Sequence, residues 1–122
     1  MLLLLTNHPL VDKYDISSLW KISIGAAPVS PKMMRAFQER LAQRGVYVTA
    51  SQAYGMTETC TAVTWPPNDR PIGTLGSGGV LLPGCVARVV KPDGSLAGIG
   101  ERGELVITGP NITLGYLNNK EA

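Results

Sequence analysis

The residues with the clearest chemical potential in this chain lie in one stretch, Tyr54-Gly55-Met56-Thr57-Glu58. The Thr57 hydroxyl can donate a hydrogen bond to a phosphate oxygen, and the Glu58 carboxylate is a hard oxygen ligand of the kind that Mg²⁺ prefers. The Tyr54 ring can lie on a base, and Gly55 lets the backbone turn or approach a ligand closely. The stretch therefore suits a nucleotide phosphate with its metal ion, and it also suits a plain strand-to-loop turn with exposed polar side chains.

A strand–helix–strand unit is predicted to position this stretch. Residues 19–24 are apolar and short, as in a buried parallel strand, and residues 46–49 are predicted to form the next strand. Between them, Ser30 is predicted to cap a helix whose first residue is Pro31, and Gly45 stands where a left-handed C-terminal cap is required. A strand, a helix and a strand of this length form a right-handed crossover unit of a parallel sheet.

Small residues follow the first predicted strand, and the stretch at residues 54–58, which suits a phosphate, follows the second. Gly25, Ala26 and Ala27 come directly after residues 19–24, and Tyr54 comes shortly after residues 46–49. Ligands of such sheets bind beyond the carboxyl ends of the strands. The topology therefore predicts that the two segments converge.

The second half of the chain has the pattern of a β-rich region. Residues 65–71 contain three prolines and form a cluster of chain breakers. We place a domain boundary there, which divides the chain into an α/β part at residues 1–68 and a β-rich part at residues 69–122. The fold class predicted is thus α/β, with a parallel βαβ segment followed by a β-rich subdomain.

Two strands and a turn are predicted within the β-rich part. Residues 85–91 and 104–108 have strand patterns, and residues 92–94 carry the Pro-Asp-Gly signal of a tight turn. Asp93 and Glu101 are interpreted as a turn carboxylate and a surface carboxylate, not as an acid–base pair.

The composition argues against several classes of protein. The 122 residues amount to one domain, with a net charge of +2 and only 6% aromatic residues, which does not favour nucleic-acid binding. No stretch is long and apolar enough to span a membrane. Residues 2–5 are apolar but lack the basic region and cleavage site of a signal peptide, so they are interpreted as part of a helix. Cys60 and Cys85 have no metal-ligand spacing and indicate a reduced, cytoplasmic setting.

Four stretches, in order, resemble the motifs of the adenylate-forming (AMP-binding) enzymes, which include acyl- and aryl-CoA ligases, luciferases and peptide-synthetase adenylation domains. Residues 54–58 resemble the Tyr-Gly-x-Thr-Glu motif of that family, and residues 25–28 resemble its small-residue segment. Residues 76–84 are similar to its glycine-led entry into a β-rich, distorted barrel-like subdomain. Residues 103–109, closed by Gly115-Tyr116, resemble its Gly-Glu-Leu…Gly-Tyr signature. The resemblance is strongest to the 4-coumarate and fatty-acid CoA ligases.

The resemblance implies a two-step reaction in which a small-molecule carboxylic acid attacks the ATP α-phosphate and the CoA thiol then displaces AMP. ATP or AMP, Mg²⁺ and coenzyme A are the implied cofactors and co-substrates. By motif position, Thr57 and Glu58 would be catalytic, with Thr57 on the α-phosphate and Glu58 on the metal, and Tyr54 would stack on adenine. The further residues implied to bind the nucleotide or border the acid are Gly25, Ala26, Ala27, Gln52, Ala53, Gly55 and Met56.

Parts of the family pattern are missing from these 122 residues. They lack the Gly-rich Ser/Thr loop that grips pyrophosphate, an Asp for the ribose and the domain with the catalytic Lys. We therefore expect a fragment of a longer ligase, partnered by the remainder of that chain and inactive by itself. The alternatives are a fragment of a peptide-synthetase adenylation domain and a non-catalytic structural or AMP-binding remnant. The expected location is cytoplasmic, a peroxisomal address stays open, and the sequence does not select the acid.

Overall fold

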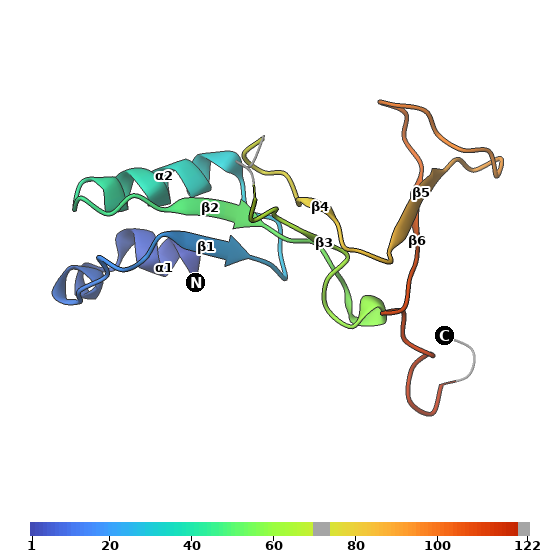
Figure 1. The fold of residues 1–122 in the computed structure, drawn as a ribbon, viewed down its shortest axis with the longest axis horizontal. Coiled ribbons are helices and arrows are strands. Elements are labelled where there is room, and N and C mark those ends of the chain that lie inside the picture. Colours follow the sequence, from blue (N-terminus) through green and yellow to red (C-terminus); the bar gives the residue numbers. More distant parts are fainter. Residues whose placement is uncertain (70–73, 120–122) are drawn as a thin grey trace. The chain divides into compact units, whose positions relative to one another are not determined.

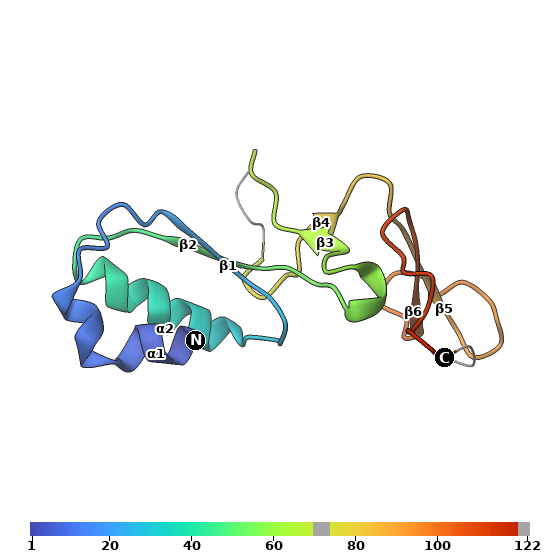
Figure 2. The same cartoon turned by 90° about the horizontal axis from the view of Figure 1, so that it is seen from below.

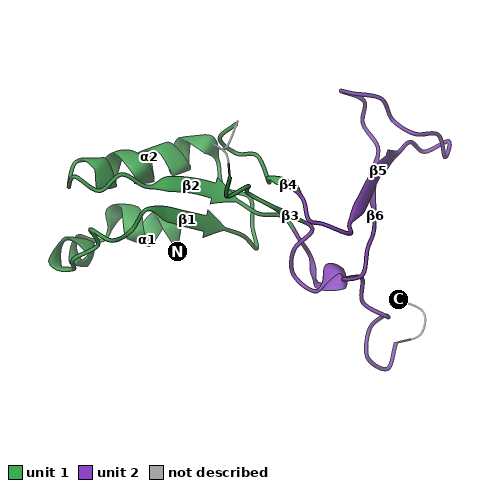
Figure 3. Ribbon diagram, viewed as in Figure 1, with its two compact units in different colours: residues 1–54, 64–80 green, residues 55–63, 81–122 purple. Residues whose placement is uncertain are grey.

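The computed structural model describes residues 1–69 and 74–119, and the chain forms two compact units (Figure 3). Unit 1 comprises Met1–Tyr54 and Thr64–Val80, and unit 2 comprises Gly55–Val63 and Leu81–Ala122. Arg70 and Pro71 of the predicted breaker cluster lie outside the described residues. The boundary between residues 68 and 69 stays a prediction.

Unit 1 is a layer of helices on one face of a parallel strand pair (Figures 1 and 2). Strands β1 and β2 run in parallel with the register Lys21↔Thr49 to Ile24↔Gln52. Helices α1 and α2 lie on the same face of this pair (Figure 2). The elements of this unit, in order, are α1 (Leu2–Asn7), the 3₁₀ helix η1 (Pro9–Lys13), β1 (Lys21–Ile24), α2 (Pro31–Ala42), β2 (Thr49–Gln52) and β3 (Thr64–Trp65).

The core of unit 1 lies between α2 and the strand pair. Met34, Phe37 and Leu41 recur at helical spacing on one face of α2 and are each about 1% exposed. They pack with Leu2 of α1 and with Val46, Val48 and Ala50, so the apolar face of the helix covers the sheet.

Helix α2 begins and ends where the sequence predicts. The Ser30 side chain accepts a hydrogen bond from the Met33 amide at 3.3 Å, and Pro31 is the first helical residue. At the other end Gly45 has φ +74°, and the Val46 amide donates to the Leu41 carbonyl at 3.0 Å. This is the hydrogen bond of a Schellman motif, for which the left-handed glycine is required.

The second strand differs from its predicted position. It was expected at residues 46–49, but β2 runs from Thr49 to Gln52. The Val46 amide is occupied by the end of α2, and the Val48 carbonyl accepts a hydrogen bond from the Gln38 side chain at 2.9 Å. Because the helix uses these backbone groups, residues 46–48 form a connection and the strand pairing starts three residues later.

Unit 2 contains the 3₁₀ helix η2 (Thr57–Thr59) and the antiparallel strands β5 (Val86–Val90) and β6 (Glu104–Thr108). The short strand β4 (Val80–Leu81), which pairs with β3, crosses from unit 1 into unit 2. The two longer strands confirm the predicted strand regions. Together with unit 1 they give the mixed α/β fold that the sequence indicates.

The predicted turn after β5 is also present. The Asp93 carboxylate accepts from the Ser95 amide at 2.9 Å, and Gly94 has φ +83°. Glu101 forms a salt bridge with Lys91 at 2.7 Å. Both carboxylates serve the local structure, in agreement with their interpretation as turn and surface groups.

Within residues 1–69 and 74–119, no helix has the length and apolar character needed to cross a membrane.

Candidate functional site

In unit 1, two predicted site segments leave the same edge of the strand pair. The last register pair is Ile24↔Gln52, and the Ala53 amide donates to the Ile24 carbonyl at 2.9 Å. Gly25, Ala26 and Ala27 therefore start beside Ala53, at the carboxyl ends of two parallel strands. This is the edge at which ligands of parallel sheets bind.

The Gln52 side chain fixes the small-residue segment. Its Oε1 accepts from the Val29 amide and its Nε2 donates to the Val29 carbonyl, both at 2.8 Å. Gln52 is only 8% exposed, so these bonds satisfy a buried amide. Ala26 has φ +69°, a left-handed conformation that is uncommon outside glycine, and Gln52 holds the far end of this turn. Sequence reasoning missed this positioning role, although a long amide at the end of a buried strand is a signal for it.

Two hydrogen bonds fix the backbone of Tyr54, and its side chain is exposed. Its amide donates to the Thr64 carbonyl at 3.3 Å, and its carbonyl accepts from the Thr64 amide at 3.1 Å. The side chain is 42% exposed. The structure thus combines a fixed backbone with a partly exposed side chain.

The remaining motif residues belong to unit 2, where Gly55 makes a close approach to its own chain. A Cβ atom at this position would lie 1.5 Å from the Thr61 carbonyl oxygen and 2.7 Å from the Ala62 Cα. The sequence suggested a turn or a close approach to a ligand. The structure shows that the backbone of residues 61 and 62 occupies the space beside this glycine.

Residues 56–62 form a tight loop around the buried Thr59 side chain. The Thr59 hydroxyl accepts from the Met56 amide at 3.1 Å and donates to the Met56 carbonyl at 3.0 Å. Cys60 and Thr61 follow with φ values of +47° and +110°, both in the left-handed region. Such strain persists only where surrounding contacts hold the backbone. Thr57 projects from this loop with an exposed side chain.

Asn111 holds this loop from a distant part of the sequence. Its Nδ2 donates to the Thr59 carbonyl at 3.0 Å and to the Ala62 carbonyl at 2.9 Å. Its Oδ1 accepts from the Cys85 thiol at 3.4 Å. Asn111 was not among the predicted site residues, and its position within the Gly-Glu-Leu…Gly-Tyr signature is the signal that could have found it.

Glu58 is anchored at both its backbone and its side chain. Its carbonyl accepts from the Thr113 amide at 2.8 Å, and its Oε1 accepts a hydrogen bond from the Tyr116 hydroxyl. This bond from Tyr116 holds the pKa of the Glu58 carboxyl below its usual value. The same bond raises the pKa of Tyr116, and the negative charge of Glu58 adds to that effect. Glu58 therefore presents a charged carboxylate in a defined orientation.

The candidate metal ligand of this loop is the single Glu58 carboxylate, which would suit Mg²⁺ that is bound together with phosphates. Among the described residues, no group of three or more His, Cys, Asp or Glu side chains could hold a metal ion. Mg²⁺ keeps several waters and is usually held by one or two carboxylates plus the phosphates of its nucleotide. The Tyr116 hydroxyl occupies one acceptor position on the carboxylate, which has about four. One such carboxylate matches this mode of binding.

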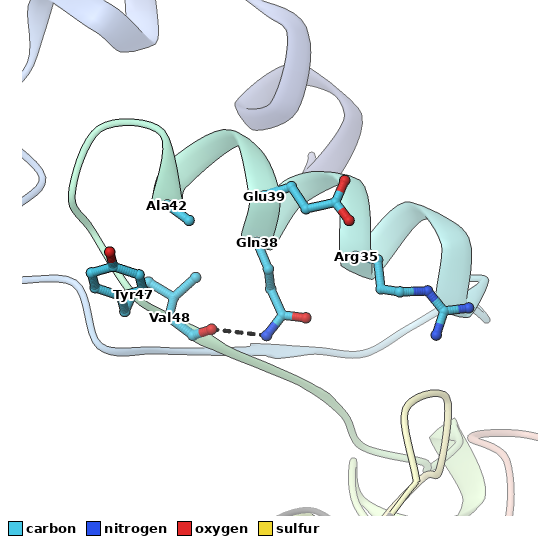
Figure 4. A pocket seen from close by; sticks show the side chains of 6 residues that line it. All are labelled: Arg35, Gln38, Glu39, Ala42, Tyr47 and Val48. Carbon is cyan, nitrogen blue, oxygen red and sulfur yellow. Dashed lines mark hydrogen bonds between the residues drawn. The ribbon is translucent and has the colours of Figure 1, made fainter.

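Surface hollows are found in both units. In unit 1, a hollow of about 320 Å³ beside α2 contains no predicted site residue, and the Gln38–Val48 hydrogen bond joins two of the residues that line it (Figure 4). In unit 2, a hollow of about 280 Å³ adjoins the 56–62 loop. The second is lined by Cys60, Thr61, Ala62, Leu82, Pro83, Cys85, Pro110 and Asn111.

The fold and these residues define an α/β protein whose candidate site residues lie at the carboxyl edge of a parallel strand pair and on the loop that follows. The pattern of the AMP-binding enzyme family matches residues 1–117, so the chain belongs to that family.

Similar proteins agree with this assignment. The "Probable 4-coumarate–CoA ligase 1" of Dictyostelium discoideum is 39% identical over 98% of this chain and 21% of its own length. The luciferin 4-monooxygenase of Photinus pyralis is 40% identical over 93% of this chain and 20% of its own length. The crystal structure of a long-chain-fatty-acid-CoA ligase from Archaeoglobus fulgidus matches with a TM-score of 0.80 and 34% identity, over 88% of this chain and 22% of that one. The chain thus spans about a fifth of the length of these relatives.

Proposed function

We propose that the chain is a segment of an acid–CoA ligase, which activates a carboxylic acid as acyl-AMP with ATP and transfers the acyl group to CoA. The observation that carries this proposal is the anchored loop at residues 56–62, which presents the Thr57 hydroxyl and the Glu58 carboxylate. The 39% identity to a protein named as a 4-coumarate–CoA ligase supports the same reaction class.

The roles of Thr57 and Glu58 follow from the chemistry of the first step. Attack of a carboxylate on the α-phosphate passes through a crowded, anionic phosphorus centre, which requires positioned donors and a metal more than a general base. Thr57 would donate a hydrogen bond from its hydroxyl to an α-phosphate oxygen, and Glu58 would hold Mg²⁺. When bound, the metal supplies positive charge that offsets the charge of the phosphates.

The unit 1 residues are proposed to bind the adenosine part and to border the acid. The exposed Tyr54 ring would stack on adenine, and the small residues 25–27 would allow close backbone approach to the nucleotide. Ala53 and Met56 would border the acid or its junction with AMP. Gln52 would act indirectly, because its amide is already paired with the Val29 backbone.

The partners proposed for the enzyme are the remainder of a ligase chain, a carboxylic acid, ATP and CoA. A cytoplasmic location is supported by Cys60 and Cys85, which are free thiols.

Glu58→Gln in the complete ligase tests the metal role. Because the lost contact is proposed to stabilise transition-state charge, kcat for adenylation should fall about 10²-fold or more, with little change in KM for the acid. Glu39→Gln is the matched control, since Glu39 is an exposed carboxylate on α2 in unit 1. Acid-dependent pyrophosphate exchange into ATP measures the rate. A change confined to KM for the acid would show that Glu58 does not serve the metal.

A further inference from the structure

We propose that Tyr116 is a positioning residue whose hydroxyl fixes the Glu58 carboxylate for its metal ion, and this inference rests on the function proposed above. The Tyr116 hydroxyl donates to Glu58 Oε1 across a sequence separation of 58 residues. Outer groups that hydrogen-bond a metal-ligating side chain set its orientation and its affinity for the metal.

The hydrogen bond is not a by-product of burial. Tyr116 is 49% exposed, and Glu58 is only partly buried. A glutamate side chain at such a position has several accessible rotamers unless a partner selects one. The Tyr116 hydroxyl supplies that selection from a distant part of the chain.

The backbone of the loop has anchors of its own. The Thr113 amide donates to the Glu58 carbonyl at 2.8 Å, and Asn111 holds the carbonyls of Thr59 and Ala62. None of these bonds involves the Tyr116 hydroxyl. Removal of that hydroxyl should therefore free the Glu58 carboxylate while the backbone of the loop keeps its path. A variant without the hydroxyl thus tests the orientation of the carboxylate and leaves the fold of the loop unchanged.

The chemical type of the partner also suits a metal ligand. A tyrosine hydroxyl donates one hydrogen bond without a positive charge, so Glu58 keeps its full negative charge and further lone pairs for a cation. A lysine or arginine in the same place would compete with the metal. Within residues 1–69 and 74–119, the basic side chains that form salt bridges are Arg40, Arg44 and Lys91, and none of them pairs with Glu58.

The test is a double-mutant cycle in the complete ligase with Mn²⁺ as the probe. Mn²⁺ affinity is measured by electron paramagnetic resonance in the presence of a non-hydrolysable ATP analogue, for the wild type, Tyr116→Phe, Glu58→Gln and the double variant. Tyr14→Phe is the matched control, because Tyr14 is 66% exposed and lies in unit 1. Tyr116→Phe should weaken Mn²⁺ binding about tenfold, Glu58→Gln more strongly, and the double variant no more than Glu58→Gln alone.

Each of the other outcomes would reject either the metal role of Glu58 or the positioning role of Tyr116. Unchanged Mn²⁺ affinity in Glu58→Gln would reject the metal role of Glu58 in the proposed function. A loss in Glu58→Gln with none in Tyr116→Phe would overturn the Tyr116 inference alone. Additive losses in the double variant, or a lower melting temperature in Tyr116→Phe than in Tyr14→Phe, would show that the hydroxyl acts through the fold and would also overturn it.

Discussion

At residue 55 the chain has no room for a side chain. The Thr61 carbonyl oxygen stands 1.5 Å from the place where a Cβ atom would be, and the atoms that would clash are backbone atoms. A flexible side chain could move aside, but the backbone of residues 61 and 62 is held by the Asn111 contact to Ala62. Gly55 therefore sets the path of the loop that carries Thr57 and Glu58.

Gly55→Ala should displace this loop. We expect a loss of stability of about 1–3 kcal/mol from overpacking and a fall in the adenylation rate of about 10²-fold, because a small misplacement of catalytic groups is costly. The melting temperature and pyrophosphate exchange of the complete ligase measure the two effects. Gly98→Ala is the control, since its Cβ would meet Glu101 Oε2 at 3.4 Å, an ordinary contact. Equal behaviour of the two variants would contradict this account of Gly55.

Four carboxylates in the described residues have a lowered pKa, those of Asp15, Glu58, Asp93 and Glu101. Hydrogen bonds from Ser17 lower the pKa of Asp15. Hydrogen bonds from Ser95 lower the pKa of Asp93, and the Lys91 contact lowers the pKa of Glu101. These partners are near in sequence and belong to the turn and strand ends. The partner that lowers the pKa of Glu58 is the distant Tyr116. Because its partner is distant in sequence, the Glu58 carboxylate differs from carboxylates that only stabilise a local turn.

At the scale of the element, the C-terminal end of helix α2 depends on one residue in the left-handed conformation, Gly45. Gly45 has φ +74° and would meet no atom within 4 Å if it carried a Cβ. Any cost of a substitution there is therefore conformational and not steric. The end of the helix also decides where β2 begins, because the Val46 amide bonds to Leu41.

Gly45→Ala should destabilise unit 1 by about 1 kcal/mol. The left-handed conformation costs an alanine about 1–2 kcal/mol, and the lower entropy of its unfolded chain returns part of this. Gly45→Asn should cost less, because asparagine adopts the left-handed conformation more readily. Thermal unfolding of the complete ligase with both variants measures the difference. An alanine variant as stable as the wild type would exclude a requirement for the left-handed residue.

At the scale of the whole molecule, the chain covers about a fifth of the length of the relatives it matches. Unit 1 contains the candidate residues 25–27 and Tyr54, and unit 2 contains Thr57 and Glu58. The family resemblance predicts that the Gly-rich Ser/Thr loop and the catalytic Lys domain lie outside these 122 residues. The reaction proposed for the complete ligase depends on positioned charge from several of these parts.

The 122-residue chain by itself should therefore form no acyl-AMP. Acid-dependent exchange of pyrophosphate into ATP should not exceed that of a heat-treated sample, while the complete ligase under the same conditions serves as the positive control. Exchange above the heat-treated level would show that these residues suffice for adenylation.

The local elements were predictable because their signals lie within a few residues of one another. Ser30, Pro31 and Gly45 define α2 through bonds that reach at most five residues along the chain, and the turn at residues 92–94 is equally local. Family motifs, which are short and ordered, likewise indicated Thr57 and Glu58. The start of β2 was predicted wrongly because strand propensity at residues 46–48 does not reveal that the helix uses their backbone groups.

The sequence alone thus determined the βαβ unit, the family and the chemical types of the candidate residues. Tertiary structure decided how those residues are held. Gln52 bonds to Val29 at a separation of 23 residues, Asn111 to Thr59 at 52, and Tyr116 to Glu58 at 58. No local pattern encodes such pairs, because they form only when the folded chain brings distant segments together. The orientation of the Glu58 carboxylate is therefore a property of the fold, whereas its presence is a property of the sequence.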